Sequence, residues 1–169
     1  MDGIIDKFDV FKVETVNDSY MCSSGLPKRN GHDHAGEMAS MALYFLDIVK
    51  QKKRNVLHLP DVPLEVRIGI NTGSVVAGVV GLKLPRYCIF GDTVNVASRL
   101  ETTGKANHIQ CSSRTKDLLD ELGGYEVEER GIVKMKGKAD QLTYWLINGD
   151  PEHRNKRRNK QLQEQNLDI

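Results

Sequence analysis

The chain has 169 residues, the length of a single folded domain, and its composition of 39% hydrophobic and 28% charged residues is ordinary for a globular protein. Its 24 basic and 23 acidic residues leave a net charge of only +1, so we predict no nucleic-acid partner. No apolar run is long enough to span a membrane, and residues 1–10 lack the pattern of a signal peptide. We therefore predict no membrane segment in this chain.

The first half of the chain predicts alternating extended and helical segments. Asn17 and Asp18, which tolerate the backbone angles of tight turns, separate two runs with strand-like alternation. Further along, apolar side chains recur at steps of three and four residues, as on the buried face of a helix. The expected elements are a hairpin over 8–24, a helix over 33–53 and extended segments over 64–70 and 72–81.

Residues 85–99, PRYCIFGDTVNVASR, combine a strand with the start of a helix. The strand over 86–90 ends at a Gly-Asp pair, and a helix is predicted from Asp92, with Asp92 as its cap. Asn95 and Arg99 are four residues apart, so both project from one face of that helix near its start. Because the first turn of a helix favours negative charge, this face would suit a ligand that bears phosphate.

The remaining elements complete an α+β domain. The sequence predicts a strand over 108–112, a helix over 113–122 capped by Ser112 or Ser113, and a final strand pair around a loop at 136–140. We expect helices packed on one antiparallel-rich sheet. The order fits a ferredoxin-like βαββαβ unit that begins at its second strand and so lacks its first strand and helix.

The chain ends in a basic segment that lacks aromatic residues. Residues 1–149 are expected to form the domain, and residues 150–169 to form a solvated, largely disordered tail, with room for some helix, rather than a dedicated binding arm. The tail contains Arg154, Lys156, Arg157, Arg158 and Lys160. The three cysteines have no metal-ligand spacing, and their odd number favours a reducing compartment.

Four pairs of side chains are candidates for binding or catalysis, although each residue also has an ordinary structural interpretation as a strand, core, helix-surface or loop residue. They are Glu14 with Asp18, Arg86 with Cys88, Asn95 with Arg99, and Lys136 with Lys138. Taken with FDVFKVETVNDSYMCSSGLPKRNG, RIGINTGSVVAGVVGLKLPRYCIFGDTVNVASRLE and GGYEVEERGIVKMKGKADQLTYWL, they make the chain resemble the catalytic domain of class III nucleotide cyclases, specifically the receptor-type guanylyl cyclases. The resemblance covers nearly all of residues 3–148.

This resemblance implies an activity, cofactors and partners. Members of the family convert GTP to cyclic GMP and pyrophosphate by in-line attack of the ribose 3′-hydroxyl on the α-phosphorus, assisted by two Mg²⁺ or Mn²⁺ ions. Two such domains associate head to tail, as a homodimer or as a heterodimer with another cyclase domain, and each site takes residues from both. The implied location is the cytoplasmic side, within a parent protein that is a plasma-membrane receptor.

The resemblance also implies the residues that recognise the base. Glu14 matches the position whose carboxylate accepts from N1–H and the 2-amino group of guanine, where adenylyl cyclases have Lys. Cys88 matches the second base-reading position, where adenylyl cyclases commonly have Asp, and Arg86 belongs to the same cluster. Adenine has no such pair of donors, so Glu14 favours GTP.

Other positions match residues that act on the ribose, the phosphates and the metal. Asn95 matches the residue that orients the ribose, and Arg99 the residue that stabilises charge on the transferring phosphorus. Lys136 matches a lysine that reaches the triphosphate. Asp18 matches one of two metal-binding aspartates, in keeping with the preference of Mg²⁺ for carboxylate oxygen.

Two departures from the family pattern leave alternatives open. The family has a preceding strand and loop of the type SDIVGF, which carries the other metal aspartate, and this sequence starts after it; Asn17 also replaces a usual glycine. The chain could be a fragment of a larger cyclase, a half-site partner of a complete cyclase, or a catalytically inactive module for nucleotide binding or dimerisation. On this basis we expect no cyclic GMP from the chain alone.

Overall fold

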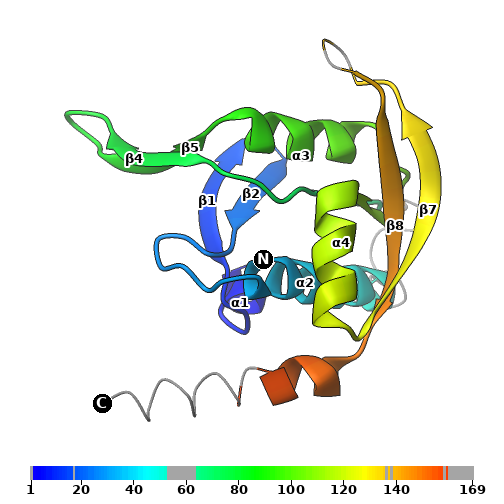
Figure 1. Ribbon diagram of the computed structural model, residues 1–169. Helices are drawn as coiled ribbons and strands as arrows, with labels where there is room; N and C mark the ends of the chain where they lie inside the picture. Colours follow the sequence, from blue (N-terminus) through cyan, green and yellow to red (C-terminus); the bar gives the residue numbers. More distant parts are fainter. Residues whose placement is uncertain are drawn as a thin grey trace.

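The computed structural model describes residues 2–16, 18–52, 64–135, 137, 139–157 and 159 (Figure 1). Its helices are α1 (Asp2–Ile5), α2 (Asp33–Lys52), α3 (Asp92–Thr102) and α4 (Ser113–Leu122). Its strands are β1 (Phe11–Val16), β2 (Ser19–Ser23), β3 (Arg67–Ile70), β4 (Val76–Val80), β5 (Arg86–Phe90), β6 (His108–Ser112), β7 (Tyr125–Val133) and β8 (Gln141–Gly149). The predicted α+β class is confirmed, and the short helix α1 is an addition to it.

The described strands pair in three sheets, where the sequence predicts one. The largest has the order β3-β6-β8-β7, with β3 parallel to β6 and the other pairs antiparallel. The strands β1 and β2 form one antiparallel hairpin, and β4 and β5 form another. Within the part of the chain that the structure describes, each hairpin therefore has its backbone hydrogen bonds only within itself.

The main core lies between the four-stranded sheet and the helices α2 and α4. Small side chains of α2 let the helix approach the sheet closely, and Leu119 of α4 is fully buried. The sheet contributes apolar side chains from β3, β6 and β8 to this core, namely Ile70, Ile109, Cys111 and Leu146. Alternate residues along these strands therefore face α2 and α4, as the period of a strand requires.

Helix α3 packs on the sheet at Gly69, on the face opposite to Ile70. A Cβ atom added at Gly69 would lie 2.4 Å from the Ala97 carbonyl oxygen and 2.4 Å from the Glu101 backbone nitrogen. Only glycine therefore allows this close approach of α3 to β3. The buried residues Val96, Leu100 and Met135 form a second, smaller apolar cluster.

The starts of α3 and α4 differ in how they are capped. Ser112 caps α4, and its Oγ accepts a hydrogen bond from the Thr115 backbone N–H, so one of the two predicted caps is confirmed. The cap of α3 is Gly91 and not Asp92, which is the first helical residue. Gly91 has φ 131°, a conformation that side chains with a Cβ rarely adopt, so a glycine is needed here.

The C-terminal segment is helical over 151–157, which agrees with the expectation of some helix, but it is docked on the domain instead of being a solvated tail. Its side chains contact the rest of the chain, and Figure 1 shows this short helix close to the ends of α2 and β8. No helix in the described ranges is both long enough and apolar enough to cross a membrane.

Candidate active site

A groove of about 340 Å³ lies between β1 and β5. Its walls are Phe11, Val13, Glu14 and Thr15 from β1, and Arg86, Tyr87 and Cys88 from β5. Three of the residues that the sequence singles out therefore meet in one place, although they come from segments about 70 residues apart. The Phe11 and Tyr87 rings, whose centroids are 5.5 Å apart and perpendicular, hold the two strands together at this groove.

An irregularity in β1 determines which side chains reach the groove. Lys12 pairs with Cys22 and Glu14 pairs with Met21, so Val13 is an extra residue on β1. Such a bulge changes the direction of neighbouring side chains. It explains why the consecutive residues 13–15 all line the groove, where a regular strand would send alternate residues to opposite faces.

The polar groups of the groove differ in their hydrogen-bonding capacity. The Glu14 carboxylate accepts only, and the Arg86 guanidinium donates only. The Cys88 thiol is a weak donor, and its Sγ lies 3.6 Å from the Arg86 carbonyl oxygen. A planar ligand with two adjacent N–H donors and a carbonyl oxygen would match this set of groups. The bulge and the ring contact leave no local pattern in the sequence, so nothing in it marks Phe11, Val13, Thr15 or Tyr87 as groove residues.

Helix α3 follows β5 directly and carries the second group of predicted residues. Asn95 is exposed and Arg99 is half-buried, one helical turn apart, while Val96 and Leu100 point into the protein. The Nη1 atom of Arg99 is buried and has no hydrogen-bond partner among the described residues. A buried guanidinium nitrogen without a partner is costly, so this atom is suited to an anion that binds from outside the chain. Asn95 and Arg99 do not line the groove.

Of the remaining predicted residues, Asp18 is exposed at the turn between β1 and β2, and it does not line the groove. Lys136 and Lys138 lie outside the described residues, as does Asn17. The residue before Lys136, Met135, is buried in the cluster with Val96 and Leu100, so this end of the β7–β8 segment lies against α3. The described residues contain no group of three His, Cys, Asp or Glu side chains arranged to hold a metal.

A larger cavity, of about 650 Å³, is lined by residues 71–76 and 112–114, the start of α3 and the start of β8. No predicted site residue that the structure describes lines it. Asn71 donates to the Thr93 carbonyl oxygen at 3.0 Å, and the Thr93 hydroxyl donates to the Ser74 carbonyl oxygen at 2.6 Å. These bonds attach the start of α3 to the loop after β3.

The three cysteines have different surroundings. Cys22 and Cys88 are half-buried. Cys111 is fully buried in the main core, and burial, with a smaller effect of the Asp120 charge, raises the pKa of its thiol to about 12. A thiol with so high a pKa is unreactive, so Cys111 is a core residue.

Comparison with known proteins gives one consistent family. The family model described as "Adenylate and Guanylate cyclase catalytic domain" matches residues 1–148. Atrial natriuretic peptide receptor 2 of Homo sapiens is 59% identical over 146 residues, which are 86% of this chain and 14% of the receptor. Receptor-type guanylate cyclase Gyc76C of Drosophila melanogaster is 58% identical over 146 residues, 86% of this chain and 9% of that protein. The chain therefore spans a small fraction of the length of these relatives.

A solved structure is similar over most of its length. The guanylate cyclase domain of RhGC from Catenaria anguillulae, in complex with GTP, superposes with a TM-score of 0.78 and 35% identity. The match covers 88% of this chain and 78% of that domain.

Proposed function

Because the chain belongs to the adenylate and guanylate cyclase catalytic domain family, we propose that it binds GTP and contributes to its conversion to cyclic GMP and pyrophosphate. The observation that carries the proposal is the convergence of Glu14, Arg86 and Cys88 in one groove. Residues 1–149 are the proposed catalytic domain, and residues 150–169 are the segment that follows it, with its helix over 151–157 docked on the domain.

The groove is the proposed site of the guanine base. Glu14 accepts hydrogen bonds from N1–H and the 2-amino group of guanine, which are adjacent donors in one plane. Cys88 and Arg86 lie on the other wall and face the carbonyl side of the base. Adenine has no pair of donors at the corresponding edge, so binding ATP would leave the Glu14 carboxylate unsatisfied.

Helix α3 is the proposed site of ribose and phosphate chemistry. Asn95 orients the ribose so that its 3′-hydroxyl faces the α-phosphorus. As the 3′-oxygen bonds to phosphorus and the bond to pyrophosphate breaks, Arg99 stabilises the negative charge that develops on the phosphoryl oxygens. The Nη1 of Arg99, which is buried and has no hydrogen-bond partner within the described ranges, supports this role. Lys136 is proposed to contact the triphosphate.

Asp18 is the residue of this chain that we propose as a metal ligand. It is an exposed carboxylate, which fits Mg²⁺ or Mn²⁺, since these ions are commonly bound by one or two carboxylates together with water and substrate phosphates. When bound, two ions per complete site supply activation of the 3′-hydroxyl and neutralisation of phosphate charge.

A dimer with another cyclase domain is the proposed assembly, either a homodimer or a heterodimer. Large apolar side chains are exposed on the β4–β5 hairpin and its turn, namely Val76, Val79, Val80, Leu82, Leu84 and Phe90. Monomeric proteins seldom expose so many neighbouring apolar side chains, and such a surface favours association. We propose that the chain lies on the cytoplasmic side of the plasma membrane as part of a receptor, by analogy with the relatives that are receptors.

A second candidate is a nucleotide-binding or dimerisation module without catalytic activity. One observation favours it: the exposed apolar side chains of the β4–β5 hairpin favour association, which needs no turnover of GTP. Such a module would bind GTP in the groove and associate through the β4–β5 hairpin, but it would not complete a site that turns GTP over.

The assignment of the groove is tested by exchanging its base-reading residues. We expect the double variant Glu14→Lys, Cys88→Asp to lose preference for GTP over ATP by about tenfold or more, because an unsatisfied buried polar group costs ~1–3 kcal/mol. Binding of fluorescent GTP and ATP analogues in the presence of Mn²⁺ measures the ratio of the two dissociation constants.

The matched control is Glu128→Lys, which makes the same change of charge at an exposed position on β7 outside the groove. This control should keep the original ratio. An unchanged preference for GTP in the double variant would show that Glu14 and Cys88 do not read the base.

A further inference from the structure

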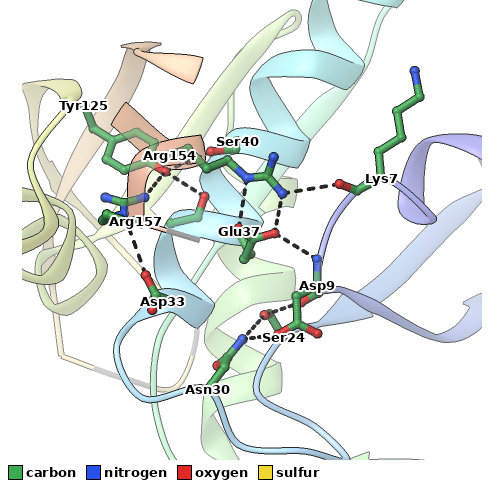
Figure 2. Close-up of polar contacts among 11 residues, drawn as sticks. Lys7, Asp9, Ser24, Asn30, Asp33, Glu37, Ser40, Tyr125, Arg154 and Arg157 are labelled. Carbon is green, nitrogen blue, oxygen red and sulfur yellow. Dashed lines mark hydrogen bonds and ion pairs between the residues drawn. The ribbon is translucent and has the colours of Figure 1, made fainter. Parts of the chain in front are cut away.

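The helix over residues 151–157 docks on the domain through two arginines (Figure 2). Arg154 and Arg157 point toward different parts of the chain: Arg154 toward α2 and the segment before β1, and Arg157 toward α4, β7 and the start of α2. Both arginines belong to the segment for which the sequence predicts a solvated tail.

Arg154 holds Glu37 and the segment before β1 at the same time. Its Nε donates to Glu37 Oε1 at 2.9 Å and its Nη2 donates to Glu37 Oε2 at 2.6 Å, which is a two-point contact. Nη2 also lies 3.3 Å from the Lys7 carbonyl oxygen, and the guanidinium lies 4.4 Å from the centre of the Phe8 ring. The pair is protected from solvent, since the side chains of Arg154 and Glu37 are 11% and 9% exposed.

Glu37 extends this contact to the next residue of the same segment. Its Oε2 accepts a hydrogen bond of 2.8 Å from the Asp9 backbone N–H. The Asp9 carbonyl oxygen accepts from the Ser24 hydroxyl, and the Asp9 carboxylate accepts from the Asn30 side chain at 2.7 Å. Asp9 therefore connects both ends of the β1–β2 hairpin, because Ser24 directly follows β2. Figure 2 shows Arg154, Glu37 and Asp9 in one continuous line of polar contacts.

The position of the β1–β2 hairpin depends on these contacts of Asp9 at its two ends. Its strands form backbone hydrogen bonds only with each other among the described strands. Phe11, the first residue of β1, lies two residues after Asp9 and is itself a wall of the groove, three residues before Glu14. A displacement of Asp9 is thus transmitted to Glu14 through a short stretch of extended backbone.

We propose that Arg154 is a positioning residue for the nucleotide groove: by clamping residues 7–9 directly and through Glu37, it fixes β1 and hence the Glu14 carboxylate against β5. This role rests on the proposed function of the groove. It assigns to the C-terminal helix a part in selecting guanine, although Arg154 does not itself line the groove.

Hydrogen exchange of the full chain without nucleotide tests the mechanical part. In Arg154→Ala, we expect amide exchange in residues 9–16 to accelerate by about tenfold or more, because removing one partner of a buried ion pair leaves the other charge uncompensated. Lys156→Ala is the matched control, since Lys156 is an exposed basic residue of the same helix. Exchange in β6 and α4 should stay unchanged in both variants.

Nucleotide binding tests the functional part. We expect Arg154→Ala to weaken GTP binding by about tenfold and to lower the GTP-to-ATP preference, while ATP binding changes less, because only guanine uses Glu14. Arg154→Lys keeps the charge but loses the two-point contact, so it should fall between Arg154→Ala and the unmodified chain. If Arg154→Ala unfolds, fast amide exchange across the whole chain reveals it. The GTP binding and amide exchange of Arg154→Lys then test the inference.

The outcomes separate this inference from the proposed function. Failure of the unmodified chain to bind GTP would refute the proposed function, whereas the exchange data would still decide whether Arg154 holds β1. Normal GTP binding in Arg154→Ala, or exchange in β1 equal to that of Lys156→Ala, would overturn the inference.

Discussion

Cys88 and Cys22 allow occupancy of the groove to be followed at a single residue. Both thiols are half-buried, but only Cys88 lines the groove. Because both are partly accessible, both should react with a small alkylating agent. We expect GTP to slow alkylation of Cys88 and to leave Cys22 unaffected, as measured by mass spectrometry of the labelled peptides. Equal protection of the two thiols, or none, would contradict the placement of the base.

Cys111 gives a prediction about pH. Its folded-state pKa of about 12 lies above the ordinary value of 9.0, because burial disfavours the thiolate. The unfolded chain therefore releases this proton at lower pH than the folded chain does. The contribution of Cys111 to stability is complete below about pH 9 and is lost as the pH rises toward 12. Urea unfolding of Cys111→Ala should show a smaller loss of stability over this pH range than the unmodified chain.

Arg99 is expected to affect turnover more than binding. The assay mixes this chain with a homologous guanylyl cyclase domain that has Ala at the position aligned with Arg99, so that turnover depends on the Arg99 supplied by this chain. Arg99→Ala should lower kcat for cyclic GMP formation by about 10²–10³, with little change in KM, because the charge it faces grows in the transition state. A large rise in KM at normal kcat would make Arg99 a phosphate clamp for bound GTP. No activity in any mixture would favour the non-catalytic module.

At the scale of elements, the contact between α3 and β3 sets where Asn95 and Arg99 lie. The atoms nearest to an added Cβ at Gly69 belong to the α3 backbone and cannot turn aside. Gly69→Ala should therefore displace α3 and lower the free energy of unfolding by about 1–3 kcal/mol, as measured by urea denaturation.

Gly78→Ala is the matched control for this change. Gly78 lies in β4 with no atom within 4 Å of an added Cβ, so its stability should change by less than about 0.5 kcal/mol. Similar losses in the two variants would show that the approach of α3 to β3 is not tight.

Elements with a clear local period were predictable, and those that depend on distant contacts were not. The predicted strands over 86–90 and 108–112 and the helix over 113–122 have the same bounds in the structure. The glycine cap of α3 escaped prediction because Asp at the start of a helix is the more common signal. The docking of the helix over 151–157 on the domain also escaped prediction, since Arg154 pairs with Glu37, 117 residues away.

The candidate site was only partly predictable, because some of its features also depend on contacts between distant segments. The resemblance identified Glu14, Arg86 and Cys88, and the structure places them in one groove; their roles stay proposals. The bulge at Val13 and the perpendicular rings of Phe11 and Tyr87 arise from strand pairing, which alternation in one strand does not reveal. The division of the strands into three sheets depends likewise on which edges meet in space.

At the scale of the whole molecule, the β4–β5 hairpin is expected to drive association. Val79 is 68% exposed on β4, and Ile132 is 71% exposed on β7. A charge at Val79 should weaken self-association by about tenfold or more, because it would be buried without a partner in the dimer. Sedimentation of Val79→Glu measures this, with Ile132→Glu as the matched control. Equal effects of the two substitutions would argue against the hairpin as the interface.

The clamp between Arg154 and residues 7–9 also dictates an order of events during biosynthesis. The Arg154 side chain and the Lys7 carbonyl oxygen that it contacts are 147 residues apart. At translation rates of about 5–20 residues per second, the ribosome adds Arg154 on the order of ten seconds after Lys7. Throughout that interval the β1–β2 hairpin of the nascent chain has no Arg154 to anchor it. We therefore expect the groove to reach its final geometry last, after α2 with Glu37, α4 and the four-stranded sheet have formed.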